Sequence, residues 1–312
     1  MKTVSIMVPT YNEEGNVELL YDAIINEFKI NVKKYDYEIV FIDNCSSDKT
    51  RQKLIKLCKK DEKVKAIFNA KNFGQLKSPY YGILQTTGEC SIMMVADFQD
   101  PVEMIHKFID EWEKGYKIVI GIKNSSKESK LFYFLRSCYY KLIKKIASTE
   151  QIEHFTGFGL YDKEFIEVLR TLNDPMPYFR GIISEIGFER KEINYEQPKR
   201  LHGKSKNNFF SLYDIGMLGI TSYSKVMIRL ATLLGSMIAG LSLLIGLVYL
   251  VLKLLFWDNF PAGSAPIAIG VFFMGAVQLL FLGLIGEYIL NINTRVMNRP
   301  LVVEERRINF KK

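Results

Sequence analysis

Apolar and polar residues alternate in blocks over the amino-terminal two thirds of the chain. Short apolar runs bounded by polar turns predict buried strands, and intervening segments with an apolar residue every three or four positions predict amphipathic helices. The predicted strands cover residues 4–9, 37–42, 64–69, 91–96 and 117–122, and the predicted helices cover 16–28, 49–59, 78–86 and 102–113. This order is typical of an α/β domain with a mostly parallel sheet and helices on both faces. Ligands of such sheets bind beyond the carboxyl ends of the strands, so we expect functional residues there.

The pattern changes in the last third of the chain, where two long runs carry no charge. Residues 230–252 form an uncharged run of 23 residues, and residues 259–286 form another of 28. Each is long enough to span a bilayer core, which needs roughly 20 helical residues. Two buried helices of a soluble core are the alternative, but only residues 253–258 separate the runs. We therefore predict two transmembrane helices.

Positive charges flank these runs and predict their orientation. Lys225 and Arg229 precede the first run, whereas six basic residues follow the second, namely Arg295, Arg299, Arg306, Arg307, Lys311 and Lys312. By the positive-inside rule, both ends of the chain are expected to be cytoplasmic. Ser236 and Gly240 form a small-x-x-x-small pair, a spacing that favours helix packing in a homo-oligomer but also arises by chance.

Composition narrows the choice of partners. The 312 residues are 48% hydrophobic, too apolar for a disordered chain, and the net charge of +8 favours anionic partners such as phosphates or lipid headgroups. Nucleic acid would account for the charge but not for the apolar runs, so we expect no nucleic-acid partner. The four cysteines, at positions 45, 58, 90 and 138, form no C-x-x-C pair, which argues against a disulfide scaffold and a zinc site and favours a reducing compartment. The apolar run within the first ten residues is too short to be the core of a signal peptide.

Polar and acidic residues follow three of the predicted strands. The first strand runs into Pro9-Thr10-Tyr11-Asn12-Glu13-Glu14, which offers a ring for stacking on a base and carboxylates for ribose hydroxyls. Either glutamate can equally be a first-turn helix residue favoured by the helix dipole. Asp43 ends the second strand, and Asp48 is expected to cap the next helix.

The fourth strand ends in Asp97-Phe98-Gln99-Asp100-Pro101. Asp97 and Gln99 are two residues apart and can share one side of an extended segment. Their oxygens suit a hard cation that bridges a diphosphate. Asp100 is expected to cap the helix that Pro101 opens.

These motifs, in this order and with the terminal spans, resemble a known family. The landmarks are Val8-Pro9-Thr10-Tyr11-Asn12-Glu13, residues 43–50, Lys71-Asn72-Phe73-Gly74, Ala96-Asp97-Phe98-Gln99-Asp100-Pro101, Phe179-Arg180-Gly181-Ile182, Gly203-Lys204-Ser205-Lys206, Gly286-Glu287-Tyr288 and Arg299-Pro300. The chain is similar to family 2 glycosyltransferases of GT-A fold, and within them to membrane-anchored polyisoprenyl-phosphate glycosyltransferases related to dolichol-phosphate mannose synthase, of the bactoprenol glucosyltransferase type.

The resemblance implies an inverting transferase that moves a sugar from a nucleotide donor to a lipid phosphate at the cytoplasmic membrane face, usually with Mg²⁺ or Mn²⁺. It implies a GT-A catalytic domain (1–206), a juxtamembrane amphipathic segment (207–229), a transmembrane hairpin (230–290) and a basic cytoplasmic tail (291–312). By carry-over, the nucleotide would be held by Pro9, Tyr11, Glu13, Asp43 and Asp97. Asp97 and Gln99 would hold the metal, and Lys123 and Arg136 would hold the lipid phosphate.

Three positions depart from the family pattern. Asn44 and Val95 stand where relatives often carry an aspartate, and the segment 154–160 lacks an aspartate that relatives place beside its glycine. The departures at Asn44 and Val95 bear on base recognition and on metal affinity. Asp162 matches a family aspartate but also precedes a helical pattern, so the simpler interpretation is a helix N-cap.

A phosphate acceptor removes the need for a catalytic base, because a phosphate monoester already carries about −1.5 to −2 charge near neutral pH. Catalysis then needs cations that hold two anions together and stabilise the leaving diphosphate. In the basic run 199–206 we assign this role to Arg200 and Lys206, with a solvated charge run as the alternative. The aromatic and basic stretch 131–146 is expected to lie on the membrane, core packing being the alternative.

The leading hypothesis is transfer of a hexose, from UDP-glucose or a similar donor, to undecaprenyl or a related polyprenyl phosphate for surface-glycan or O-antigen modification. One alternative is a glycosyltransferase that acts on a sugar hydroxyl during glycan elongation, with Glu185 as its base. Another is a catalytically weakened membrane scaffold that binds nucleotide-sugars. This alternative is motivated by Asn44 and Val95, which stand at positions that are often acidic in relatives.

Overall fold

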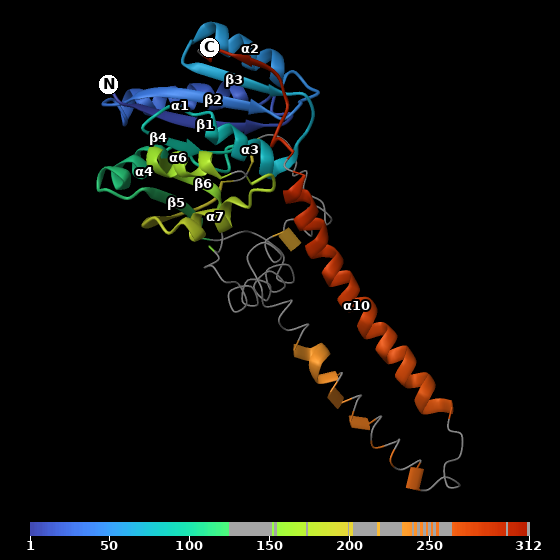
Figure 1. The fold of residues 1–312 in the computed structure, drawn as a ribbon. Helices are drawn as coiled ribbons and strands as arrows, with labels where there is room; N and C mark the ends of the chain where they lie inside the picture. The colour runs from blue at the N-terminus through green and yellow to red at the C-terminus, as the bar shows by residue number, and fades with distance from the viewer. Residues whose placement is uncertain are drawn as a thin grey trace.

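The computed structural model describes residues 1–124, 152, 155–172, 174–198, 200–201, 217–218, 264–297 and 299–310, with scattered residues between 233 and 255. In this part of the chain, helices cover both faces of one mixed sheet, and a long helix leads away from it (Figure 1). The predicted α/β class is therefore confirmed.

The sheet has eight strands in the order β7-β5-β6-β4-β1-β2-β3-β8. The strands are β1 (Thr3–Thr10), β2 (Asp36–Asp43), β3 (Val64–Asn69), β4 (Cys90–Met93), β5 (Ile118–Lys123), β6 (Phe155–Asp162), β7 (Arg190–Tyr195) and β8 (Glu304–Ile308). Strands β6 and β8 run antiparallel to their neighbours, and the other pairings are parallel. The mostly parallel sheet is thus as predicted, and it brings the carboxyl ends of β1, β2, β3 and β4 to one edge.

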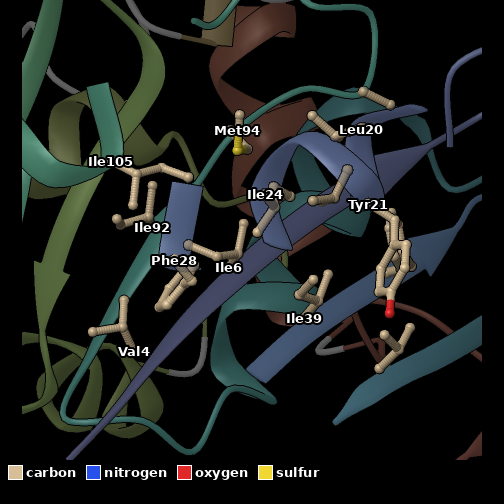
Figure 2. Packing of buried hydrophobic residues seen from close by; sticks show 14 of the residues in the cluster. Val4, Ile6, Leu20, Tyr21, Ile24, Phe28, Ile39, Ile92, Met94 and Ile105 are labelled. Atoms are coloured by element: carbon tan, nitrogen blue, oxygen red, sulfur yellow. The ribbon is translucent and has the colours of Figure 1, made fainter. Parts of the chain in front are cut away.

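Two hydrophobic clusters lie on opposite faces of the sheet, because alternate side chains of a strand point in opposite directions. Ile6 and Val8 of β1 belong to the first cluster, whereas Met7 between them belongs to the second. The first face is covered by α1 (Val17–Ile30), α2 (Thr50–Lys60) and α4 (Met104–Glu113), and the second by α3 (Gly74–Leu84), α6 (Lys163–Thr171) and α7 (Phe179–Ile186). Figure 2 shows the first cluster, where Leu20, Ile24 and Phe28 of α1 pack beside β1.

The five predicted strands and four predicted helices are present, with ends that differ by a few residues. Strands β6, β7 and β8 were not predicted. Gly157 and Gly159 interrupt the apolar pattern of β6. Strands β7 and β8 lie at the edges of the sheet, and charged residues make up half of β7 and most of β8. Edge strands are commonly charged because charge blocks unwanted pairing, and the apolar signal is lost with it.

The carboxyl-terminal residues join the sheet. We expected residues 291–312 to form a basic tail, but residues 304–308 form β8, which pairs antiparallel with β3. The amide of Ala70 donates to the Val303 carbonyl at 2.9 Å. The side-chain amide of Asn309 donates to the carbonyls of Cys58 and Val64 at 2.7 and 2.8 Å. These bonds make the end of the chain part of the catalytic domain.

Helix α10 (Ser264–Val296) is 33 residues long. Within the described residues, its segment Phe273–Val296 alone has the length and hydropathy for a membrane crossing, with a mean hydropathy of 1.8. None of the side chains described there is buried. The second predicted span therefore has a helical counterpart that suits membrane association. Residues 207–229, apart from 217–218, and about half of residues 230–252 lie outside the described residues, so the two-helix hairpin and the proposed boundaries remain predictions.

Candidate active site

Side chains of the β2–α2 loop fix the loop that follows β1. The backbone amides of Asn12, Glu13 and Glu14 donate to the Ser46 and Thr50 hydroxyls at 2.8 Å each and to Asp48 Oδ2 at 3.2 Å. Asn12 adopts a left-handed backbone conformation with φ of 57° and accepts from the amide of Ser47 at 2.8 Å. The two loops therefore form one unit at the edge of the sheet.

Within this unit, Asp48 has the structural role that we predicted. Its Oδ1 accepts from the Thr50 amide at 2.9 Å at the start of α2. Burial opposes the charged form of Asp48, but hydrogen bonds from Thr50 and Glu14 outweigh it, so the pKa of Asp48 lies below its usual range. The Glu13 carboxylate accepts from the Asn16 side-chain amide at 2.6 Å at the start of α1, and its predicted role in nucleotide binding stays a prediction. Pro9 and Tyr11 flank the same strand end and are partly exposed.

Asp43 is fully buried at the end of β2. Its Oδ2 accepts from the Ser46 amide at 3.1 Å and pairs with Arg51 Nε at 2.8 Å. Its Oδ1 is buried and has no hydrogen-bond partner among the described residues. A buried oxygen without a partner is costly, so a ligand N–H or O–H group that reached this atom would satisfy it.

Asn44, beside it, organises the loop between β3 and α3. Its Nδ2 donates to Asn72 Oδ1 at 2.8 Å and to the Gly74 carbonyl at 3.2 Å. Its Oδ1 accepts from the Phe73 amide at 2.9 Å and from Asn69 Nδ2 at 3.2 Å. An aspartate has no amide donor and could not make the first two bonds when ionised. The departure from the family pattern at this position therefore has a structural reason.

Asp97, Gln99 and Arg200 come together after β4. Arg200 Nε lies 3.1 Å from Asp97 Oδ2 and 3.0 Å from Gln99 Oε1. The Gln99 amide donates to Asp97 Oδ1 at 3.1 Å, and Phe98 between them has a positive φ of 61°. The amide of Leu201 donates to the Asp97 carbonyl at 3.3 Å, which holds the start of the basic run against this loop. The structure thus unites one residue of that run with both predicted metal ligands.

The oxygens of Asp97 and Gln99 form a donor set that fits Mg²⁺ or Mn²⁺. Both oxygens contact the same cationic nitrogen of Arg200, so a divalent ion held by both would have to take the place of that nitrogen. Mg²⁺ typically takes one or two protein oxygens and completes its shell with substrate phosphates and water. No group of three or more His, Cys, Asp or Glu residues that could hold a metal occurs in the described ranges. A metal here would consequently depend on the diphosphate of a donor.

Asp100 has a different role from the helix cap that we expected. Its Oδ2 accepts from the Val95 amide at 2.9 Å, and its Oδ1 accepts from the Tyr195 hydroxyl at 3.3 Å. It thereby closes the loop that carries Asp97. Burial raises the pKa of Asp100 to about 7, although the Val95 hydrogen bond and the charge of Lys123 oppose this. By contrast, Asp162 is the predicted N-cap, since its carboxylate accepts from the Glu164 amide at 2.9 Å.

The remaining predicted residues are distributed as follows. Lys123 ends β5 at the same edge of the sheet as Asp97, because β5 runs parallel to β4. Arg136 and Lys206 lie outside the described residues, so their roles stay predictions. Glu185, the base of the alternative hypothesis, is an exposed residue of α7.

Sequence reasoning missed Arg51, which contacts Asp43, and Glu305 of β8, which contacts Arg51 at 2.8 Å. The sequence does contain an indication for Arg51. A basic residue in the first turn of a helix is unfavourable next to the positive end of the helix dipole, so an acidic partner is expected nearby. No local signal marks Glu305, which is 254 positions away.

The chain is similar in sequence to known proteins. Residues 5–187 match the model of the family described as Glycosyl transferase family 2. CsbB of Bacillus subtilis, a protein named as a glycosyltransferase, is 35% identical to the chain over 95% of this chain and 89% of its own length. The SfII prophage-derived bactoprenol glucosyl transferase of Shigella flexneri is 31% identical over 95% of this chain and 96% of its own length.

Solved structures are similar at low sequence identity. A glucosyl-3-phosphoglycerate synthase from Mycobacterium tuberculosis, in complex with Mn²⁺, UDP and phosphoglyceric acid, has a TM-score of 0.49 and 14% identity over 70% of this chain and 76% of that chain. The mannosyltransferase PcManGT from Pyrobaculum calidifontis, in complex with GDP-Man and Mn²⁺, has a TM-score of 0.47 and 16% identity over 70% and 61% of the two chains. Similarity at this level carries no inference about activity.

Proposed function

The chain belongs to glycosyl transferase family 2, and on that premise we propose that it transfers a hexose from a nucleotide-sugar to a polyprenyl phosphate at the cytoplasmic face of a membrane. The donor is a UDP-hexose such as UDP-glucose, the acceptor is undecaprenyl phosphate or a similar lipid, and the product serves surface-glycan modification. That the chain is a glycosyltransferase follows from the family. Donor, acceptor and membrane face are the proposal.

One observation supports this proposal above all. A candidate nucleoside-binding residue and a candidate diphosphate-binding cluster lie at the same edge of the sheet. Asp43 has a buried oxygen without a partner in the described part of the chain, and Asp97, Gln99 and Arg200 form a cluster two strands away. A nucleoside that donates to Asp43 would extend its diphosphate toward Asp97 and Arg200. This direction matches the general rule that ligands lie across the carboxyl ends of parallel strands.

The chemistry requires charge management more than proton transfer. A phosphate oxygen of the acceptor forms a bond to the anomeric carbon, the bond from that carbon to the donor diphosphate breaks, and UDP leaves with the electron pair. Attack from the opposite side inverts the anomeric centre. The acceptor is already anionic, so no base is needed to remove a proton.

Arg200 is the described cation closest to this chemistry. Its guanidinium has several donors in a fixed planar arrangement, and Asp97 and Gln99 occupy Nε, so the remaining N–H groups are available to diphosphate oxygens. Such preorganised charge acts on the leaving group as its negative charge grows. A divalent metal held by Asp97 and Gln99 would replace the Arg200 Nε contact and would neutralise diphosphate charge when bound. Lys206 would add a second cation from the same basic run, and Lys123 and Arg136 would hold the acceptor phosphate.

The membrane location is supported by α10 and by the names of the relatives. The exposed apolar surface of Phe273–Val296 suits a lipid environment. Helix α10 ends at Val296, and β8 begins at Glu304. A membrane-embedded α10 would therefore bring this edge of the sheet near the lipid surface. We propose a multi-pass protein of the cytoplasmic membrane with both termini cytoplasmic and a homo-oligomeric state.

The test is a transfer assay with purified full-length protein, undecaprenyl phosphate, Mg²⁺ or Mn²⁺, and radiolabelled UDP- and GDP-hexoses. We expect label from one donor to enter the organic phase, and Asp97→Asn to lose at least about 100-fold in rate, as expected when a group that organises transition-state charge is neutralised. Asp110→Asn is the matched control, because Asp110 is an exposed carboxylate of α4. Label that enters only a sugar-hydroxyl acceptor, or none at all while UDP still binds, would contradict the proposal.

A further inference from the structure

Arg51 connects three segments that are distant in sequence. It lies in the first turn of α2, where a positive charge faces the positive end of the helix dipole. Its Nε contacts Asp43 Oδ2 at 2.8 Å, its Nη1 contacts Glu305 Oε2 at 2.8 Å, and its Nη2 donates to the Asn69 carbonyl at 2.6 Å. Its guanidinium carbon lies 5.6 Å from the centre of the Phe68 ring. These contacts offset the unfavourable position and fix the side chain.

The contact with Arg51 determines what Asp43 offers to a ligand. The Ser46 amide and Arg51 Nε together occupy Oδ2, so the carboxylate cannot turn without breaking two bonds. Its Oδ1 is left as a buried acceptor without a partner among the described residues. Without Arg51, either oxygen could turn toward the ligand or toward Ser46, and the ligand would bear the cost of ordering the group.

Glu305 in turn determines where Arg51 lies. It belongs to β8, which pairs with β3, and Asn69 at the end of β3 supplies the third contact of Arg51. The neighbouring residue Glu304 has separate partners, because it contacts Tyr81 at 2.8 Å and pairs with Arg307. The two glutamates therefore allow the contact with Arg51 to be separated from the anchoring of the strand.

We propose that Arg51 is a positioning residue that holds Asp43 ready for the donor nucleoside, and that Glu305 of the carboxyl-terminal strand holds Arg51. The inference rests on the proposed role of Asp43. It links donor binding to the strand that directly follows α10, since a shift of β8 would release Arg51 and then Asp43.

The experiment measures binding of UDP, and of GDP in parallel, to full-length protein with Mg²⁺ by titration calorimetry. Asp43→Asn, Arg51→Gln and Glu305→Gln are compared with wild type, and Glu304→Gln is the matched control in the same strand. We expect Arg51→Gln to raise the Kd about tenfold, in the range found when a residue that orients a ligand-binding group is removed. Glu305→Gln should raise it up to about fivefold, because its ion pair is half exposed. Glu304→Gln should leave it within about twofold.

A double-mutant cycle separates positioning from a general loss of structure. If Glu305 acts through Asp43, Glu305→Gln should have no further effect on Kd in the Asp43→Asn background. Glu305 is exposed, so this variant keeps the test valid even if Arg51→Gln does not fold. Wild-type binding that Asp43→Asn leaves unchanged would refute the proposed nucleoside contact. Two other results would refute the positioning role alone. In one, Asp43→Asn weakens binding but Arg51→Gln and Glu305→Gln do not. In the other, the effects of Glu305→Gln and Asp43→Asn on the binding free energy are additive.

Discussion

Asn44→Asp is the change that most directly tests how the donor loop is built, since it restores the residue that relatives often carry. The variant keeps the acceptor that receives bonds from Phe73 and Asn69 but replaces Nδ2 with an oxygen. That oxygen would face Asn72 Oδ1 and the Gly74 carbonyl, which are now 2.8 and 3.2 Å away. Asn72 cannot simply turn to repair the contact, because its Oδ1 also accepts from the Gly74 amide at 2.8 Å.

The magnitude follows from these contacts. Two lost hydrogen bonds at about 1 kcal/mol each, with added repulsion between oxygens at a buried site, give a destabilisation of about 2–3 kcal/mol. This corresponds to a fall of about 5–10 °C in Tm for a domain of this size. A neutral carboxyl could donate to one acceptor, so the pKa of the introduced group should be raised in the folded state. The destabilisation should therefore shrink as the pH falls below about 5.

Thermal unfolding of the detergent-solubilised protein, followed by intrinsic fluorescence between pH 4 and pH 8, is the assay. Asn194→Asp is the matched control, because Asn194 is exposed on β7 and should change stability by less than about 0.5 kcal/mol. If Asn44→Asp and Asn194→Asp have the same Tm at pH 8, the structural explanation for Asn44 is refuted.

Two further predictions concern buried carboxylates. Asp162→Ala removes the cap of α6 and the acceptor that lies 2.6 Å from Trp112 Nε1. The free energy of unfolding, measured in urea, should fall by about 2 kcal/mol. A fall of less than about 0.5 kcal/mol would contradict the cap. Burial raises the pKa of Asp100 in the folded state to about 7 from an ordinary value of 3.8. The stability of the wild-type protein should therefore fall as the pH rises from about 4 to about 7. The variant Asp100→Asn has no carboxyl group to titrate and should not show this fall. Equal pH dependence of Tm in the two proteins would refute that assignment.

The central strands and the helices between them could be predicted from the sequence, because burial on both faces of a parallel sheet imposes apolar runs and helix periodicity. The positions of Asp43, Asp97 and Gln99 followed from the same pattern, since each comes directly after such a run. Strands β6, β7 and β8 escaped prediction because edge position and glycine remove the apolar signal. The interpretation of Asp100 as a cap was wrong, because its partners are Val95 and a tyrosine that is 95 positions away.

The sequence by itself therefore determined the fold class, the family and the strand ends at which a nucleotide-sugar would bind. Only the tertiary structure decided which charged groups meet there. Arg200 reaches Asp97 across about a hundred positions, and Glu305 reaches Arg51 across 254. Periodicity reports whether a residue is buried, which is a local property of each element. Ion pairs between distant segments depend on the order of the strands in the sheet, and Glu305 lies on an edge strand whose charged residues carry no apolar pattern.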